Sequence, residues 1–357
     1  MTQYPKSDVM MSRSIAVFLF FAAIILAACR FNRPEAGNKP MTTEPPIVEE
    51  VTSTLGPISE TQIKLLDFHT GRNDYVVSVD DTPREFIVYV PAGYDPALPT
   101  PVVYMIHGSN QSGQVMFENT GWAKKADEET ILVVYPTSWK YRTTESNRVE
   151  DKWNTPGTAK IVKTGTTLKD DVKFMRIILG HLQLTFNVDA HRIFASGFSN
   201  GGGFVLTRLI PEMNDVFGAY STSGAGLIGE AKPADGTSTV HASLFSVLGT
   251  NDNKIGENQD IPMPFPIDPN ELLNHPSFGP MLEKTTSFLG LEMTSTIERS
   301  PDYTKFTFDA STEDAGNEFI FMMVKGLFHV YPSGDNNRLD LNVADLSWEF
   351  FLKHIKP

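Results

Sequence analysis

The stretch Gly197-Phe198-Ser199-Asn200-Gly201 decides how the rest of this sequence is interpreted. It has the Gly-x-Ser-x-Gly pattern of a sharp strand-to-helix corner, which lifts a serine hydroxyl clear of the sheet where a base and a second reactant can reach it. Glycine on both sides lets the strained turn form and lets the helix approach neighbouring strands without a Cβ clash. Because a short pattern of common residues also arises by chance, the flanking segments must supply the supporting evidence.

The flanking segments have the required secondary structure. A strand is predicted at 191–196, directly before the corner, and a helix at 202–209, directly after it. Upstream, residues 101–106 form the continuous apolar run of a parallel strand that is buried on both faces. The remaining predicted elements are strands at 75–79, 85–90, 131–135, 216–221, 244–248, 303–308 and 318–324, and helices at 122–130, 170–186, 281–289 and 343–354.

This alternation of strands and helices predicts an α/β fold. Right-handed crossovers then give a mostly parallel central sheet with helices on both faces. The strands at 75–79 and 85–90 are expected to be antiparallel edge strands. The stretch 137–167 has no clear periodicity and is expected to be a long irregular loop of the kind that often binds a ligand or forms a lid.

Length and charge narrow the class of protein. The chain has 357 residues, enough for one large α/β domain, and its composition of 41% hydrophobic and 20% charged residues is that of an ordinary globular protein. Its formal net charge of −13 argues against nucleic acid or anionic lipid as a partner.

The N-terminal segment has the anatomy of an export signal. Lys6 and Arg13 precede an unbroken apolar run at 15–28, which is too short to span a bilayer comfortably. The run ends at Leu26-Ala27-Ala28-Cys29, which resembles a bacterial lipobox, and Cys29 is the single cysteine. We therefore expect cleavage before Cys29, lipid attachment to its thiol, and a membrane anchor. The alternative is a plain signal peptide cut after Ala28.

Three regions follow from this interpretation. Residues 1–28 are the predicted lipoprotein signal peptide, with Met10 and Met11 as alternative starts. Residues 29–60, rich in Pro, Thr and Glu, are predicted to be a lipidated, disordered linker. Residues 61–357 are the predicted catalytic domain, exported and held at the cell surface or secreted.

A candidate catalytic triad emerges from residue types and chain order. A serine hydroxyl is a poor nucleophile until a histidine accepts its proton, and that histidine needs a carboxylate to orient it. In α/β-hydrolases these residues occur in the order Ser, Asp or Glu, His, each after a strand. Ser199, Asp252 and His329 follow this order, each just past a predicted strand. Asp309 and Asp314 are weaker alternatives for the acid, because they flank a turn between predicted strands.

Two backbone amides are expected to stabilise the oxyanion that such a serine would generate. One belongs to Asn200, the residue after the nucleophile, and the other to the loop His107-Gly108-Ser109. Ser109 is assigned as the second donor, with Gly108 as the alternative. His107 itself is interpreted as a structural part of this loop rather than as a base.

The sequence resembles the polyhydroxybutyrate depolymerase and feruloyl esterase-like family of α/β-hydrolases, from about residue 61 to the C-terminus. The similar segments are Arg84 to Pro91, His107-Gly108-Ser109, Asp170-Asp171-Val172, 188–193, Gly197 to Gly202, Gly249-Thr250-Asn251-Asp252 and His329-Val330-Tyr331-Pro332. The resemblance implies a secreted serine esterase that cleaves acyl, aryl or polyester bonds and needs no metal or cofactor.

Departures from the family pattern concern the substrate. Phe328 and Tyr331 replace the Gly and Trp that commonly flank the catalytic histidine, and the insertion at 253–280 is longer than usual. Trp139, Trp153, Phe328 and Tyr331 are the candidate substrate-binding residues. The alternative is that these side chains only pack against the core.

Two other functions are compatible with the same residues. The first competitor is a peptidase of the same fold, and the second is a non-catalytic surface binding lipoprotein. The pattern Gly224-x-Gly226-x-x-Gly229 has the form of a dinucleotide fingerprint, but Pro233 and Gly236 break the helix that it would need.

Overall fold

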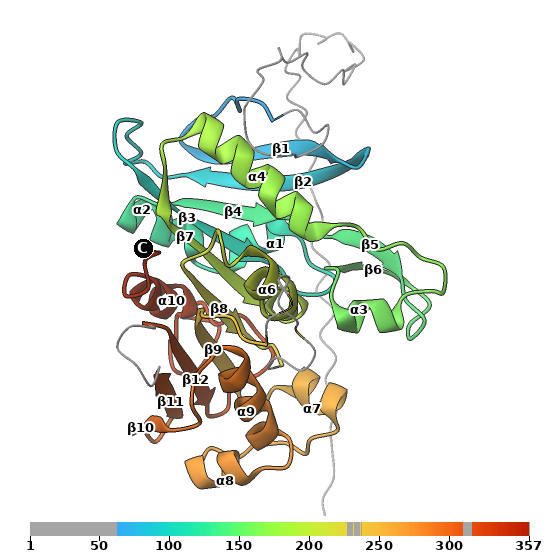
Figure 1. The fold of residues 1–357 in the computed structure, drawn as a ribbon, viewed down its shortest axis with the longest axis vertical. Coiled ribbons are helices and arrows are strands. Elements are labelled where there is room, and N and C mark those ends of the chain that lie inside the picture. Colours follow the sequence, from blue (N-terminus) through green and yellow to red (C-terminus); the bar gives the residue numbers. More distant parts are fainter. Residues whose placement is uncertain (1–62, 227–230, 232–235, 237, 310–315, 357) are drawn as a thin grey trace, which may run out of the picture. The chain divides into compact units, whose positions relative to one another are not determined.

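The apolar run around residues 101–106 lies at the centre of a ten-stranded sheet (Figure 1). The computed structural model describes residues 63–226, 231, 236, 238–309 and 316–356. Within them, every residue of β3 (Thr100–Ile106) is buried. The strand order is β1-β2-β4-β3-β7-β8-β9-β12-β11-β10. The pairs from β4 to β12 are parallel, and the outer pairs at both ends are antiparallel, so the predicted α/β fold is confirmed.

The other strands of this sheet are β1 (Gly71–Val79), β2 (Thr82–Val90), β4 (Leu132–Pro136), β7 (Val188–Phe198), β8 (Ala219–Ser223), β9 (Ser243–Gly249), β10 (Ser295–Arg299), β11 (Tyr303–Asp309) and β12 (Glu318–Val324). The helices are α1 (Gly113–Asn119), α2 (Trp122–Glu129), α3 (Pro156–Ile161), α4 (Asp171–Thr185), α5 (Asn200–Phe204), the π-helical turn η1 (Val205–Leu209), α6 (Ile210–Met213), α7 (Asn253–Gln259), α8 (Pro269–Asn274), α9 (Phe278–Phe288) and α10 (Val343–Phe351).

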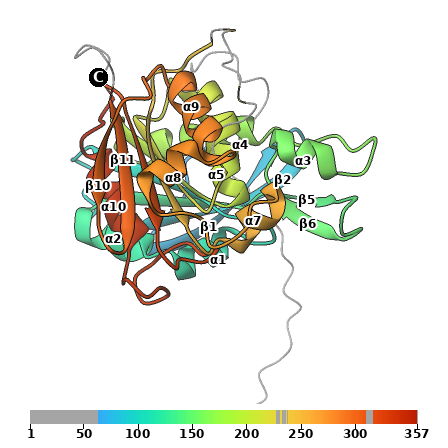
Figure 2. The same ribbon diagram turned by 90° about the horizontal axis from the view of Figure 1, so that it is seen from below.

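Helices cover both faces of the sheet, as predicted. Alternate β3 side chains point to opposite faces because a strand has a period of two. Tyr104 belongs to the core shared with α4, α5 and α9. Met105 belongs to the core shared with α1, α2 and α10. Figure 2 shows α4 and α1 on opposite sides of the strands.

The prediction of a long irregular loop at 137–167 is wrong. This stretch contains a hairpin of β5 (Trp139–Arg142) and β6 (Val149–Lys152), followed by α3. Each strand has only four residues, so the alternation of Trp139 and Tyr141 with charged residues in β5 is too short to identify a strand. The helix did have a detectable signal, since Thr155 caps it and Pro156 occupies its first turn.

Several boundaries also differ from the predictions. The helix after the corner begins at Asn200, two residues earlier than expected, and β8 begins at Ala219, three residues later. The strand β10 and the helices α1, α7 and α8 were not predicted.

The predicted signal peptide, Cys29 and the linker lie outside the described residues. Within the described ranges, no helix combines the length and apolar character that crossing a membrane requires.

Candidate active site

Ser199 occupies the strained corner that the sequence predicted, between β7 and α5. Its φ of 52° and ψ of −119° lie in a region that a non-glycine residue rarely adopts. A Cβ on Gly197 would lie 2.6 Å from the Gly201 carbonyl oxygen. A Cβ on Gly201 would lie 2.4 Å from the carbonyl oxygens of Ile106 and His107. The corner therefore requires glycine at both positions.

His329 connects the serine to a buried carboxylate. Its Nε2 lies 2.9 Å from the Ser199 Oγ, and its Nδ1 lies 2.8 and 3.0 Å from the two carboxylate oxygens of Asp252. Since an ionised carboxylate only accepts hydrogen bonds, Nδ1 carries the proton and Nε2 is free to accept one from the serine. The His329 ring packs against Phe198, with centroids 5.0 Å apart.

Asp252 is held by hydrogen bonds to His329 and to the first turn of α7. It is the N-cap of α7, and its Oδ1 accepts a hydrogen bond from the Ile255 N–H at 3.0 Å. Its residue exposure is 1%. The alternative acid Asp309 is an exposed residue at the end of β11, and Asp314 lies outside the described residues.

Ser199, Asp252 and His329 come together because each follows a strand of the parallel part of the sheet. They follow β7, β9 and β12 respectively, and the carboxyl ends of parallel strands meet at one edge. The structure thus brings together the three residues predicted from chain order, although 130 residues separate Ser199 from His329.

Two backbone N–H groups beside Ser199 are available to an oxyanion. The Gly108 N–H already donates to the Gln111 side-chain oxygen at 2.9 Å, so the alternative donor Gly108 is occupied. For the N–H groups of Ser109 and Asn200, the described part of the chain offers no hydrogen-bond partner. A Cβ on Gly108 would lie 3.1 Å from the Ser199 Cβ, so the backbone of this loop passes close to the nucleophile.

His107 orients the Ser109 amide. Its Nε2 accepts a hydrogen bond from the Ser138 N–H at 2.9 Å, so its Nδ1 is the protonated nitrogen and donates to the Gly108 carbonyl at 2.6 Å. That carbonyl and the Ser109 N–H belong to one planar trans peptide and point in opposite directions. Burial lowers the pKa of His107 to about 4, and the Arg84 charge adds to this, so the ring stays neutral at physiological pH.

Trp153 links the two sides of this arrangement, and its predicted role as a substrate wall is wrong. The side chain is fully buried. Its indole N–H donates to the His107 carbonyl at 2.8 Å, and its backbone N–H donates to the Asn200 side-chain oxygen at 2.8 Å. The ring stacks on Phe204 at 5.1 Å. Trp153 therefore pins the loop to the core, which was the alternative interpretation.

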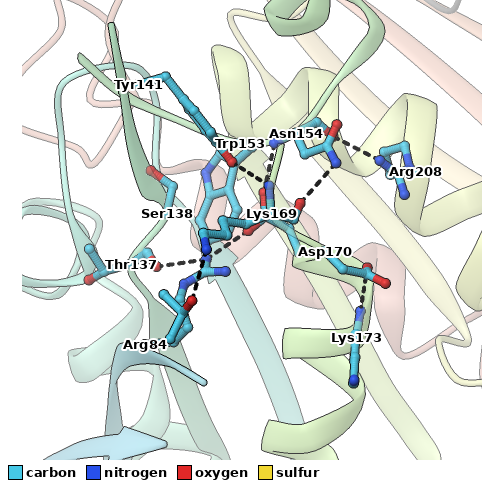
Figure 3. A network of polar contacts seen from close by, with 12 residues as sticks. Arg84, Thr137, Ser138, Tyr141, Trp153, Asn154, Lys169, Asp170, Lys173 and Arg208 are labelled. Atoms are coloured by element: carbon cyan, nitrogen blue, oxygen red, sulfur yellow. Dashed lines mark hydrogen bonds and ion pairs between the residues drawn. The ribbon is translucent and has the colours of Figure 1, made fainter. Parts of the chain in front are cut away.

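A buried ion pair holds the segment that carries Trp153 (Figure 3). Arg84 and Asp171 are 2.7 Å apart, with side-chain exposures of 1% and 0%. The second Asp171 oxygen accepts a hydrogen bond from the Asn154 N–H at 2.7 Å, next to Trp153. These contacts fix the backbone that carries Trp153.

Tyr331 is also not a substrate wall. It is buried, its hydroxyl accepts a hydrogen bond from the Trp122 indole at 2.8 Å, and the Ser196 hydroxyl lies 3.3 Å away. Burial raises the pKa of Tyr331 well above its usual value. Phe328 is 61% exposed beside His329, and Trp139 is half-buried on β5. Only these two of the four predicted substrate-binding residues present surface to a ligand.

Two polar residues of the site were missed. The Gln111 side-chain oxygen accepts the hydrogen bond of the Gly108 N–H, and the Lys152 Nζ lies 3.0 Å from the Ser109 Oγ. Neither has a sequence signal, because their roles depend on how β6 and the loop after β3 face each other. Within the described ranges, no group of three or more His, Cys, Asp or Glu residues could hold a metal ion.

An open α/β sheet that places a serine at this corner, with an aspartate and a histidine after two later strands, defines an α/β-hydrolase. A family described as "Putative esterase" matches residues 79–244, a segment that includes Ser199 and ends before Asp252.

Known proteins support this assignment. The chain is 27% identical over 176 residues to a bifunctional acetylxylan esterase/xylanase from Neocallimastix patriciarum, covering 49% of this chain and 22% of that protein. The chain therefore spans about a fifth of the length of that relative. An acetyl xylan esterase from Aspergillus awamori superposes with a TM-score of 0.50 at 13% identity, covering 79% of this chain and 99% of the other, and shares the fold.

A poly(3-hydroxybutyrate) depolymerase from Bordetella parapertussis superposes with a TM-score of 0.47 at 17% identity, covering 79% of this chain and 91% of the other. The predicted resemblance to esterases of the α/β-hydrolase fold is confirmed by the family match, the curated relative and the shared fold.

Proposed function

We propose that the protein is a serine carboxylic ester hydrolase that works through an acyl-enzyme, with Ser199 as nucleophile. The observation that carries this proposal is the hydrogen-bonded series from Ser199 Oγ to His329 Nε2 and from His329 Nδ1 to Asp252, beside two backbone N–H groups without a partner in the described chain. Nucleophile, base, orienting acid and oxyanion donors are the parts that ester hydrolysis requires.

In the first half-reaction, Ser199 Oγ attacks the ester carbonyl carbon while His329 Nε2 takes the serine proton. The carbonyl oxygen becomes an oxyanion that accepts hydrogen bonds from the Ser109 and Asn200 amides. The tetrahedral intermediate then collapses, the bond to the alcohol oxygen breaks, and His329 protonates the leaving alcohol. Asp252 holds the histidine tautomer and stabilises the transient imidazolium.

In the second half-reaction, water takes the place of the alcohol. His329 removes a proton from the water, whose oxygen attacks the acyl carbon. The same two amides stabilise the second oxyanion. The bond to Ser199 Oγ breaks, His329 returns the proton to the serine, and a carboxylic acid leaves. No cofactor takes part in this scheme.

The substrate is proposed to carry an acyl, aryl or polyester ester bond. Support comes from the names of the matched proteins, which include an acetylxylan esterase and a poly(3-hydroxybutyrate) depolymerase. Rates with methyl ferulate, acetylated xylan and short hydroxybutyrate oligomers compare the three bond types. The bond type with the highest kcat/KM identifies the substrate class.

We also propose that the enzyme is exported and anchored by lipid on Cys29, with residues 29–60 as a linker to the catalytic domain at 61–357. The support is the sequence alone, namely the basic and apolar segments that precede Ala28-Cys29. Metabolic labelling with a fatty-acid analogue should mark the full-length chain and leave a Cys29→Ser variant unmarked. Equal labelling of both proteins would contradict the anchor.

Ser199→Ala tests the catalytic proposal. We expect kcat/KM for p-nitrophenyl acetate to fall by about 10⁴-fold or more, because the nucleophile is lost while the binding groups remain. A fluorophosphonate probe should label the wild type and not the variant. The matched control is Ser243→Ala, a serine that is also hydrogen-bonded to a histidine, which should retain both activity and labelling.

Two outcomes separate the alternative functions. Cleavage of peptides at a higher kcat/KM than any ester would favour a peptidase of the same fold. Wild-type protein that hydrolyses neither and resists the probe would favour a non-catalytic surface binding lipoprotein.

A further inference from the structure

The ammonium group of Lys152 contacts the residue whose amide is available to an oxyanion. Lys152 is the last residue of β6, and its side chain is 14% exposed. Its Nζ lies 3.0 Å from the Ser109 Oγ and 3.2 Å from a carboxylate oxygen of Glu150. The Glu150 carboxylate is itself held, because it accepts hydrogen bonds from the hydroxyls of Thr143 and Ser146. The ammonium therefore joins a fixed carboxylate to the Ser109 hydroxyl.

The backbone on both sides of Lys152 is hydrogen-bonded to the two segments that carry the oxyanion donors. Before it, the Asp151 carbonyl accepts a hydrogen bond from the Asn110 N–H at 3.0 Å, one residue past the donor of the loop after β3. After it, the Trp153 N–H donates to the side-chain oxygen of Asn200, the residue with the other donor, at 2.8 Å. The position of Lys152 is therefore set by the site and not by a loose surface contact.

The contact with Lys152 leaves the hydroxyl hydrogen of Ser109 unused. An ammonium group has only donors, so the Ser109 Oγ must be the acceptor in this hydrogen bond. Among the residues that the structure describes, none accepts a hydrogen bond from this hydroxyl. A hydroxyl that accepts from a cation is polarised and becomes a stronger donor. Ser109 therefore has two available donors, its backbone N–H and its hydroxyl.

The hydroxyl can reach the same acceptor as the Ser109 N–H. In the gauche rotamers of a serine, Oγ lies close to the backbone nitrogen of the same residue, so one oxygen can accept from both groups. An ester carbonyl oxygen gains a lone pair when it becomes the oxyanion. A third donor beside the amides of Ser109 and Asn200 therefore stabilises the oxyanion more than the ester, and such a difference raises kcat.

We propose that the Ser109 hydroxyl is a third oxyanion donor and that Lys152 is the positioning residue that directs its hydrogen toward the oxyanion. This inference rests on the proposed ester hydrolase function and adds one side chain to its two backbone donors. Ser109 contacts the reacting oxygen, whereas Lys152 acts only through Ser109.

Ser109→Ala tests the third donor, because it removes the hydroxyl and keeps the backbone N–H. With p-nitrophenyl acetate, kcat and kcat/KM should both fall by about tenfold or more, since the lost hydrogen bond forms only in the transition state. The Ki of a trifluoromethyl ketone, which forms an anionic adduct with Ser199, should rise by the same factor. Ser109→Thr keeps a hydroxyl and should restore most of the rate.

The matched control for this change is Ser112→Ala. Ser112 belongs to the same loop, and its side chain makes no capping hydrogen bond to α1. The control should keep the wild-type kcat and Ki. A Ser109→Ala enzyme whose kcat and Ki both stay within about twofold of wild type would overturn the third donor.

Lys152→Met tests the positioning role. It should lower kcat by about threefold to tenfold in the wild-type background and should have no further effect in Ser109→Ala, because Lys152 acts through that hydroxyl. Lys152→Arg keeps a cationic donor and should retain most of the rate. Lys140→Met, which removes an exposed cation from β5 of the same hairpin, is the control and should match wild type.

Two results would overturn the role of Lys152. One is a Lys152→Met enzyme with wild-type kcat, and the other is an equal loss in both backgrounds. In each case Ser199-dependent hydrolysis of p-nitrophenyl acetate would persist, so the ester hydrolase proposal would stand. A wild type that does not hydrolyse the ester would instead contradict the proposed function.

Discussion

Two clusters in this molecule each join a serine, a histidine and a carboxylate. In the first, Ser199, His329 and Asp252 meet at the carboxyl ends of β7, β12 and β9. In the second, the His354 Nδ1 lies 3.0 Å from the Ser243 Oγ and its Nε2 lies 2.9 Å from Glu318. Ser243 and Glu318 are the first residues of β9 and β12, so this cluster lies at the opposite edge of the sheet.

The difference between the clusters lies in the backbone. Ser243 is buried in a regular strand, and its Oγ also accepts a hydrogen bond from the Glu318 N–H at 3.2 Å. Ser199 has a φ of 52°, is half-exposed, and follows a loop whose Ser109 amide has no partner in the described chain. The side chains of a triad are thus present in both clusters, while the strained corner and the available oxyanion donors accompany the Ser199 cluster.

The largest expected effect comes from neutralising Asp252, the acid of the first cluster. Asp252→Asn should lower kcat for p-nitrophenyl acetate by about 10⁴-fold, because an amide favours the wrong histidine tautomer. Asparagine is as good an N-cap as aspartate, so α7 should remain folded. Glu318→Gln, the matched change in the second cluster, should leave kcat within about twofold, since Glu318 lies at the opposite edge of the sheet from Ser199. Comparable losses in both variants would contradict the distinction.

Glycine substitutions test the role of the corner itself. Gly201→Ala should cost about 3 kcal/mol of unfolding free energy or more, because its Cβ would meet two backbone oxygens. Gly203 belongs to the same helix, and a Cβ there has no neighbour within 4 Å. Gly203→Ala should therefore be neutral or stabilise by about 0.5–1 kcal/mol. Denaturant titration measures both variants, and equal stability of the two would refute the close approach.

The smallest effect concerns His107, a buried histidine beside the first cluster. Its pKa is lowered to about 4, so the folded state prefers the neutral ring. The unfolded chain binds a proton below pH 6.5, and the stability from this residue is therefore complete above that pH and is lost as pH falls toward 4. By pH 4.5 the loss should reach about 2–3 kcal/mol.

Unfolding free energies of wild type and His107→Asn at pH 7 and 4.5 check this value. The asparagine keeps a donor near the Gly108 carbonyl but cannot titrate. The fall in unfolding free energy between pH 7 and pH 4.5 should therefore be smaller in the variant than in the wild type by about 2–3 kcal/mol. Identical pH dependence in the two proteins would show that His107 does not carry it.

Much of the fold could be predicted from the sequence. The apolar run at 101–106 predicted β3, because a strand buried on both faces needs apolar side chains at every position. The β5–β6 hairpin could not be predicted, since each strand has only four residues and Val149 is the one apolar residue of β6. Its formation depends on pairing between strands and on Tyr141, which is buried.

The candidate site divides in the same way. Ser199, Asp252 and His329 were found because their order and the preceding strands are local features of the sequence. Trp153 and Tyr331 were misassigned to a substrate wall, because an aromatic residue near a catalytic position looks the same in sequence whether it faces the ligand or the core. Only their burial and their hydrogen bonds distinguish the two roles.

The sequence by itself determined the alternating strands and helices, the glycine-flanked corner, and the order of serine, aspartate and histidine. These features depend on neighbouring residues and on the sterics of each residue type. The tertiary structure alone decided that Ser199 rather than Ser243 has an activated environment. It also decided that Gln111 accepts the Gly108 N–H and leaves the Ser109 N–H available, and that Trp139 borders a cavity. Those outcomes depend on side-chain direction and on contacts between distant segments, which packing of the whole sheet establishes.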